Sequence, residues 1–113
     1  MPNKTPAPPN TTCDVYHQGN APPNPPDVAG LPVFLQGRFG NLKPPAAAVY
    51  THVMHVAIGA DVRFGNNEQV YIPDKNGTKF SVTFVQRIRA GGGNDYKEVY
   101  LYRQAVNWPS TNL

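Results

Sequence analysis

The residues that most often do chemistry in proteins are few in this chain, with three histidines and one cysteine. His52 and His55 lie three residues apart in a segment whose composition predicts a β-strand, where successive side chains alternate between faces. This odd separation directs the two rings to opposite sides, so we do not expect them to share a metal ion. His17 has only Cys13 and Asp14 near it in the sequence. We interpret all three histidines as ordinary polar positions.

Other catalytic arrangements have equally little support. A cysteine nucleophile needs a base and a fixed pocket, whereas Cys13 follows two threonines in a proline-rich segment. A single cysteine also rules out an internal disulfide and a zinc site built from several thiolates. The run of three glycines at 91–93 lacks the lysine of a phosphate-binding loop and predicts a hairpin connection. The carboxylates fall mostly at predicted turns: Asp14, Asp27, Asp61, Glu68, Asp74, Asp95 and Glu98. We therefore expect no enzymatic activity and no cofactor.

The basic residues suggest contact with an acidic partner. The formal net charge is +3 and the pI about 9.2, but no three basic residues are consecutive. Arg87 and Arg89, with Lys97 or Arg103 across the predicted hairpin, would gather on one face of a sheet. We take Arg87, Arg89 and Arg103 as the candidate basic face for non-specific contact with DNA.

Three tyrosines beside these cations allow a second interpretation. Tyr96, Tyr100 and Tyr102, with cationic neighbours, resemble a platform on which bases of a single strand stack. Alternation along the strand, however, places Lys97 and Arg103 on the opposite face from the tyrosines. The competing interpretation is a half-buried face from which long side chains reach solvent.

The distribution of proline predicts two unlike parts. Eleven of the thirteen prolines lie in the first 45 residues, and residues 1–30 hold few large apolar side chains. Such a segment cannot bury enough surface to offset its ordering entropy, so we expect an extended arm over residues 1–30. Residues 14–17 are interpreted as one short strand or docking element within it. A second extended tail is expected over residues 107–113.

The composition of residues 31–106 predicts a β domain. Segments rich in β-branched and aromatic residues alternate with turn signals, at 33–39, 50–57 (continued at 60–63), 69–72, 79–89 and 96–103. Asn76-Gly77 predicts a tight hairpin with positive φ angles, and strict alternation places Phe80, Val82 and Phe84 in the core. The expected fold class is all-β, a small antiparallel β-barrel or sandwich.

The chain also carries no membrane or secretion signal that we recognise. No stretch approaches the roughly 20 apolar residues that cross a bilayer. The first residues lack the apolar core of a secretory signal. We expect a cytosolic protein without membrane partners.

The β-rich half resembles the head-closure, or stopper, group of head–tail joining proteins in tailed bacteriophages. The resemblance covers about half of the chain, and the Asp-Val-Arg-x-Gly sequence at 61–65 is similar to the turn before the third barrel strand of such proteins. It is carried by residues 53–103, which begin with a strand ending in 58–63 and continue with 65–67, 70–73, 77–85 and 97–103.

This resemblance implies a non-enzymatic virion protein, assembled in the host cytoplasm. Its subunits would form a homo-oligomeric ring between portal and tail and line the DNA channel. Segments 40–49 and 91–95 are the candidate gate loops. We take Val15, Tyr16 and Trp108 as candidate assembly contacts, because aromatic anchors dominate such interfaces. Two alternatives stay open: a capsid-decorating (cement) protein whose arm staples shell subunits, and a single-stranded nucleic-acid-binding β module.

Overall fold

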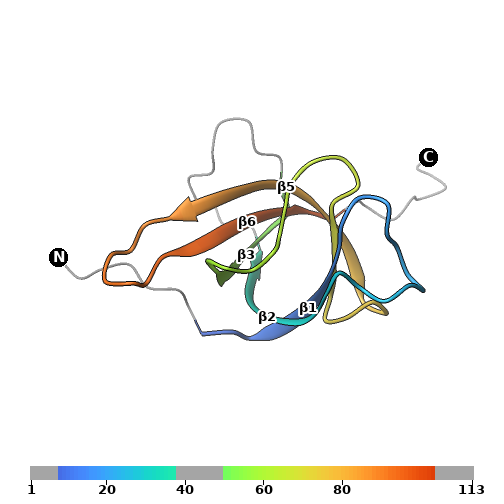
Figure 1. Cartoon of the computed structure of the whole chain (residues 1–113), viewed down its shortest axis with the longest axis horizontal. Helices are drawn as coiled ribbons and strands as arrows, with labels where there is room; N and C mark the ends of the chain where they lie inside the picture. The colour runs from blue at the N-terminus through green and yellow to red at the C-terminus, as the bar shows by residue number, and fades with distance from the viewer. Residues whose placement is uncertain (1–7, 38–49, 104–113) are drawn as a thin grey trace.

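A computed structural model describes residues 8–37 and 50–103, and these residues form six β-strands, arranged as Figure 1 shows. The strands are β1 (Thr11–Tyr16), β2 (Val28–Gly37), β3 (His52–Ala57), β4 (Gln69–Ile72), β5 (Thr78–Ile88) and β6 (Tyr96–Tyr102). The described residues contain no helix, and so none that could span a membrane. The expected all-β class is confirmed.

Every strand pairs antiparallel with two neighbours, in the order β1-β2-β3-β6-β5-β4, and β4 pairs back onto β1. The sheet therefore closes into a barrel, which decides between the two architectures left open by the sequence. Closure leaves none of these six strands as a free edge, so the barrel offers no ready template for adding a strand from a neighbour.

The strand that closes the barrel comes from the proline-rich segment. Thr11 pairs with Val33 of β2 on one side, and Tyr16 pairs with Gln69 of β4 on the other. β2 likewise begins at Val28 rather than after residue 30. The structure thus differs from the expected arm over residues 1–30: residues 11–16 and 28–30 belong to the barrel. Long-range pairing has overridden the local composition that predicted an extended arm.

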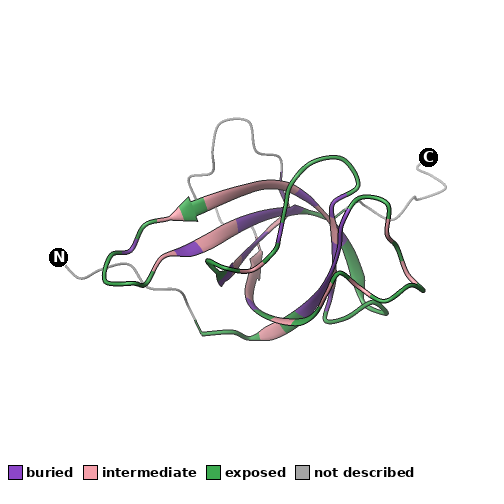
Figure 2. Ribbon diagram, in the orientation of Figure 1, coloured by how far each residue is buried: buried purple, intermediate pink, exposed green. Residues whose placement is uncertain are grey.

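The core fills the interior of the barrel and takes buried side chains from all six strands. Figure 2 marks the buried residues in purple along the ribbon. β1 contributes Cys13 and Val15, which are almost fully buried. The other members from the strands are Val33, Met54, Val56, Val70, Ile72, Phe80, Val82, Val99 and Leu101. Alternation on β6 holds as predicted, since Val99 and Leu101 point inward while Tyr100 joins a separate cluster with Tyr50 and Val53.

A β-bulge in β5 corrects one predicted core position. Val82 pairs with Leu101 and Phe84 with the next residue, Tyr100, so Thr83 is the additional residue. The Thr83 hydroxyl donates to the Tyr100 carbonyl (3.1 Å). Beyond the bulge the faces are exchanged, and Phe84 packs beside Tyr100 instead of pointing into the core as expected.

Both predicted hairpins are present, but their glycines act differently. The three glycines between β5 and β6 all have positive φ (76°, 58° and 79°), which glycine adopts without the usual strain. Asn76 and Gly77, between β4 and β5, do not take the positive φ angles that were predicted. Gly77 is needed for a different reason, because a Cβ there would collide with the Ile72 carbonyl oxygen and lie 2.7 Å from the Pro73 ring.

Candidate functional site

The most elaborate part of the structure is the segment that joins β3 to β4, residues 58–68, which we call the plug loop. β3 and β4 lie three places apart in the closed order of six strands, on opposite sides of the barrel. The plug loop therefore has to cross one end of the barrel. It does so with Val62 buried in the core and Ala60 packed against it.

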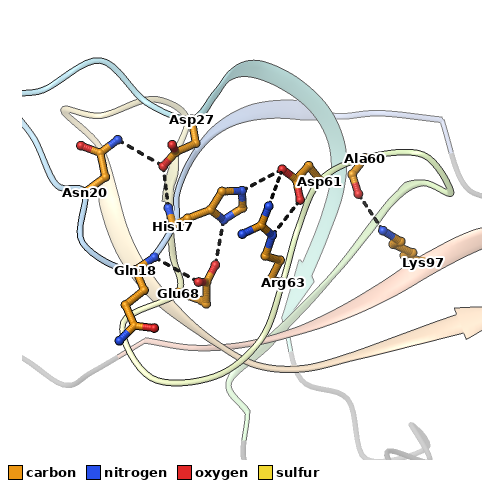
Figure 3. A network of polar contacts seen from close by, with 9 residues as sticks. All are labelled: His17, Gln18, Asn20, Asp27, Ala60, Asp61, Arg63, Glu68 and Lys97. Atoms are coloured by element: carbon orange, nitrogen blue, oxygen red, sulfur yellow. Dashed lines mark hydrogen bonds and ion pairs between the residues drawn. The ribbon is translucent and has the colours of Figure 1, made fainter.

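A histidine between two carboxylates fastens the plug loop (Figure 3). His17 follows β1 directly, and its Nδ1 lies 2.8 Å from Glu68 Oε1 while its Nε2 lies 3.0 Å from Asp61 Oδ2. Only a protonated imidazole donates from both nitrogens, so this geometry favours the imidazolium. His17 thereby connects the end of β1 to two points of the plug loop, 44 and 51 residues further along the chain.

The charges of this network support one another. Burial by itself lowers the pKa of His17, but the hydrogen bonds to Glu68 and Asp61 together raise it above its usual value. The pKa of Asp61 is lowered by its hydrogen bonds from His17 and Arg63. The backbone N–H of His17 and the side chain of Asn20 likewise lower the pKa of Asp27. The network is therefore most stable with a charged histidine and ionised carboxylates.

Further hydrogen bonds hold the plug loop to the hairpin on its other side. Lys97 on β6 donates from Nζ to the Ala60 carbonyl (2.7 Å) (Figure 3). The backbone N–H of Val82 on β5 donates to the Glu68 carbonyl (2.9 Å). The Glu68 side chain also accepts from the Gln18 N–H (3.0 Å). Because β5, β6 and the residues directly after β1 all contribute, the loop is held in a defined position over the barrel.

Between the plug loop and the β5–β6 hairpin lies a pocket of about 460 Å³. Three cationic side chains line it: Arg63 from the plug loop, Arg87 from β5 and Lys97, which pairs with Arg87 across the hairpin. The rest of its lining is apolar, with Ile58, Val62, Phe64 and Val85. We call this the end pocket. Cations beside an apolar surface suit an anionic ligand that also has an apolar face.

The two arginines of the end pocket are held by exposed ion pairs, whereas Lys97 donates one of its three N–H groups to the Ala60 carbonyl. Arg63 pairs with Asp61 (3.0 Å) and Arg87 with Asp95 (2.8 Å), and both guanidinium side chains are more than half exposed. Exposed pairs of this kind contribute little stability. In the described part of the chain, neither Lys97 nor Arg89 forms an ion pair with a carboxylate. An incoming anion would therefore displace little.

The structure separates the three arginines proposed from the sequence. Arg87 lies at the end pocket, and Arg89 is exposed just beyond the end of β5. Arg103 follows the other end of β6, where its N–H donates to Thr51 Oγ1 (2.8 Å). Six residues of extended chain place it about 20 Å from Lys97. Arg103 therefore does not share a basic face with Arg87. Arg87 pairs with Lys97 near one end of β6, whereas Arg103 follows the other end of that strand.

Burial also removes two of the three tyrosines from the stacking platform that the sequence suggested. Tyr96 and Tyr100 are 1% and 3% exposed, so their faces are not open to a base, and only Tyr102 is substantially exposed. The Tyr100 hydroxyl donates to Glu98 (2.7 Å), and burial together with this bond raises its pKa. The exposed aromatic residue at the cationic end is Phe64, which sequence reasoning missed.

The structure describes two of the three candidate assembly contacts, Val15 and Tyr16. Val15 and Tyr16 are fully buried within their own barrel, so they are not available as anchors on a neighbour. Tyr16 packs edge-to-face on Tyr71, and its hydroxyl donates to the Asn24 carbonyl (2.7 Å). Trp108 lies outside the described residues, as do residues 40–49 of one candidate gate loop.

Cys13, His52 and His55 pack against other side chains of the barrel. Cys13 is buried in β1, where burial, with a smaller contribution from Asp14, raises the pKa of its thiol to about 12. His52 and His55 do point to opposite sides, since His52 stacks on the core residue Phe80 and His55 on Tyr96. The part of the chain that the structure describes holds no group of three or more His, Cys, Asp or Glu arranged to bind a metal ion.

Comparisons with protein-family models, with curated proteins and with solved structures find no match to this chain.

Proposed function

We propose that this protein is a non-enzymatic structural protein of a bacteriophage virion. Its subunits would form a ring at the head–tail junction, between portal and tail, through which DNA passes. The proposal combines the resemblance of residues 53–103 to head-closure proteins with a closed β-barrel of small size.

The observation that carries the proposal furthest is a group of cations at one end of the barrel. Arg63, Arg87 and Lys97 line the end pocket, and Arg89 lies exposed two residues beyond Arg87. A few cations give one subunit weak attraction to DNA. A ring repeats the same surface around its axis, so each additional subunit adds phosphate contacts and strengthens binding. A modest patch is thus suited to an assembly.

The closed barrel changes how the subunits would hold one another. Because the six strands leave no free edge, the subunits would not be joined by a strand added to a neighbour's barrel. Trp108 and the terminal residues before position 8 remain the proposed contacts with neighbours.

The first test is the mass of the purified protein in solution, by light scattering coupled to size-exclusion chromatography. The full chain should form one defined oligomer, and negative-stain micrographs should show closed rings with a central opening. A chain that begins at residue 8 keeps every described strand, so it should stay folded. If the first seven residues hold the ring together, this shorter chain should have the mass of a monomer instead of that of the oligomer. Monomers for both chains, at the highest concentration reached, would contradict the ring.

Two alternatives give different results in the same experiment. A capsid-decorating protein follows the symmetry of the shell, so it would bind purified shells without forming rings alone. A single-stranded nucleic-acid-binding module would remain monomeric and bind oligonucleotides. The cationic end of the barrel is the observation that favours this last alternative.

A further inference from the structure

We propose that the end pocket binds one nucleotide unit of single-stranded DNA, with its phosphate among Arg63, Arg87 and Lys97 and its base on Phe64. The inference goes beyond the proposed function and does not depend on it, because it names an unpaired strand as the ligand and stands on the geometry of the pocket itself.

The phosphate side of the pocket is built from two segments. Arg87 and Lys97 are paired across the β5–β6 hairpin, and Arg63 faces them from the plug loop. Guanidinium groups bind phosphate oxygens in a two-pronged geometry, and an ammonium adds a point charge. The partners that a phosphate would replace, Asp61 and Asp95, are held in exposed pairs. Asp61 also keeps His17 as its second partner when Arg63 turns away.

The base side of the pocket is an exposed aromatic ring supported from below. Phe64 is 55% exposed, the most exposed large apolar side chain among the described residues. Its ring packs on Phe84 at 5.4 Å between centroids, and Phe84 packs in turn on the buried Tyr100 at 6.4 Å. Ile58, 36% exposed, borders the same pocket. The ring is therefore positioned before a ligand arrives, which lowers the entropy cost of stacking.

The β5 bulge is what creates this support. Without the additional residue Thr83, Phe84 would point into the core, and Phe64 would lack its neighbour. The same shift places Val85 and Arg87 on the face that lines the end pocket. The β5 bulge thus directs Phe84, which supports the Phe64 ring, to one face of the strand and Arg87 to the other.

Single-stranded DNA fits this combination better than duplex DNA. In a duplex the faces of the bases are stacked on one another, so only the phosphates would reach the pocket. An unpaired base offers a free face, and stacking on an aromatic side chain tolerates any sequence.

The experiment is a fluorescence anisotropy titration of the full chain with a labelled deoxythymidine oligonucleotide at several salt concentrations. Phe64→Ala should weaken binding between about 5-fold and about 150-fold, the range for one stacked base. Arg87→Gln should weaken binding and lower the magnitude of the salt slope by about 0.7, the value for one phosphate on a single strand. An oligonucleotide of the same length without bases should bind the unmodified protein as weakly as the intact one binds Phe64→Ala.

Matched controls lie at the other end of the barrel. Arg103→Gln removes the same charge as Arg87→Gln, and Tyr102→Ala removes an aromatic ring that is 37% exposed. Both controls should bind within about 2-fold of the unmodified protein. Equal losses for Arg87→Gln and Arg103→Gln would show an effect of net charge and overturn the site. Tighter binding of duplex than of single strand would overturn the base contact.

The same samples separate this inference from the ring. A defined oligomer that does not bind the oligonucleotide overturns the nucleotide site and leaves the ring in place. A monomer that binds it, with the losses described above, overturns the ring and leaves the site in place. Thermal unfolding of each variant verifies that a lost affinity is not a lost fold.

Discussion

His17 shows how a single side chain can hold a loop across the end of a barrel. Its ring contacts carboxylates from both halves of the plug loop, and its backbone N–H donates to Asp27 (2.7 Å). Removing the ring would leave Glu68, itself buried, without its closest partner. Buried polar groups that lose a partner cost more than the bond itself contributed.

This arrangement predicts how stability depends on pH. The folded protein holds the His17 proton more tightly than the unfolded chain, whose histidine has a pKa near 6.5. The stabilisation is therefore complete below pH 6.5 and is lost as pH rises through the folded pKa. Asp61 and Asp27 act in the opposite sense, because their pKa values are lowered from 3.8, and their stabilisation is lost as pH falls through the folded values. These groups together place maximum stability between about pH 4 and about pH 6.5.

The measurement is the free energy of unfolding in urea at pH 5.5 and pH 8.5. Relative to the unmodified protein, His17→Gln should lose about 2 kcal/mol at pH 5.5 and less at pH 8.5, where His17 has lost its proton. His52→Gln should have the opposite effect on the pH dependence, since burial and Arg103 lower the pKa of His52 and its protonation opposes folding at pH 5.5. An unchanged pH dependence in His17→Gln would contradict the role assigned to His17.

At the scale of elements, β1 decides whether the sheet is open or closed. Its composition is poor in large apolar residues, yet it pairs on both sides and contributes Cys13 and Val15 to the core. Asp14 in the same strand accepts the N–H groups of Gly30 and Lys75, both at 2.9 Å, and so connects β2 to the β4–β5 turn. Removing β1 would expose edges on β2 and β4 at once.

We therefore predict opposite outcomes for two truncations. A chain that begins at residue 8 keeps β1 and should unfold cooperatively like the full chain. A chain that begins at Leu31 lacks β1 and the first residues of β2, so it should lose cooperative unfolding and aggregate through its open edges. Circular dichroism and thermal unfolding of the two purified chains test this. A folded, soluble chain from Leu31 would show that β1 is an appendage and not a wall of the barrel.

At the scale of the whole molecule, closure should make unfolding cooperative. No described strand lies at an edge, so none can separate without breaking hydrogen bonds on both of its sides. Local opening with a low free energy is then confined to loops and termini. The plug loop, which forms one side of the end pocket, is held to this cooperative unit by the buried Val62 and by hydrogen bonds from His17 and Lys97.

Cys13 provides a probe of that cooperativity. Its thiol is buried and its pKa is raised to about 12, so it should not react with a thiol reagent at neutral pH until the barrel opens. The free energy of opening from labelling rates at increasing urea should equal the free energy of global unfolding. A labelling free energy several kcal/mol smaller would mean that β1 separates alone, and the cooperative barrel would be ruled out.

The sequence alone determined the elements whose signals are local. The strand at 69–72, the two hairpins, the inward Val99 and Leu101 and the opposed His52 and His55 follow from alternation and turn residues, which need no information from distant segments.

Tertiary structure decided the rest, because its causes lie far apart in the chain. β1 is a strand because two distant strands pair with it, and Phe84 leaves the core because a bulge lets β5 follow β6. His17 meets Asp61 and Glu68 only once the plug loop crosses the barrel. Phe64 and Arg63 carry no local signal of their own, and the fold alone places them beside Arg87 and Lys97. Short-range patterns specify which segments extend, whereas packing and closure specify which side chains meet.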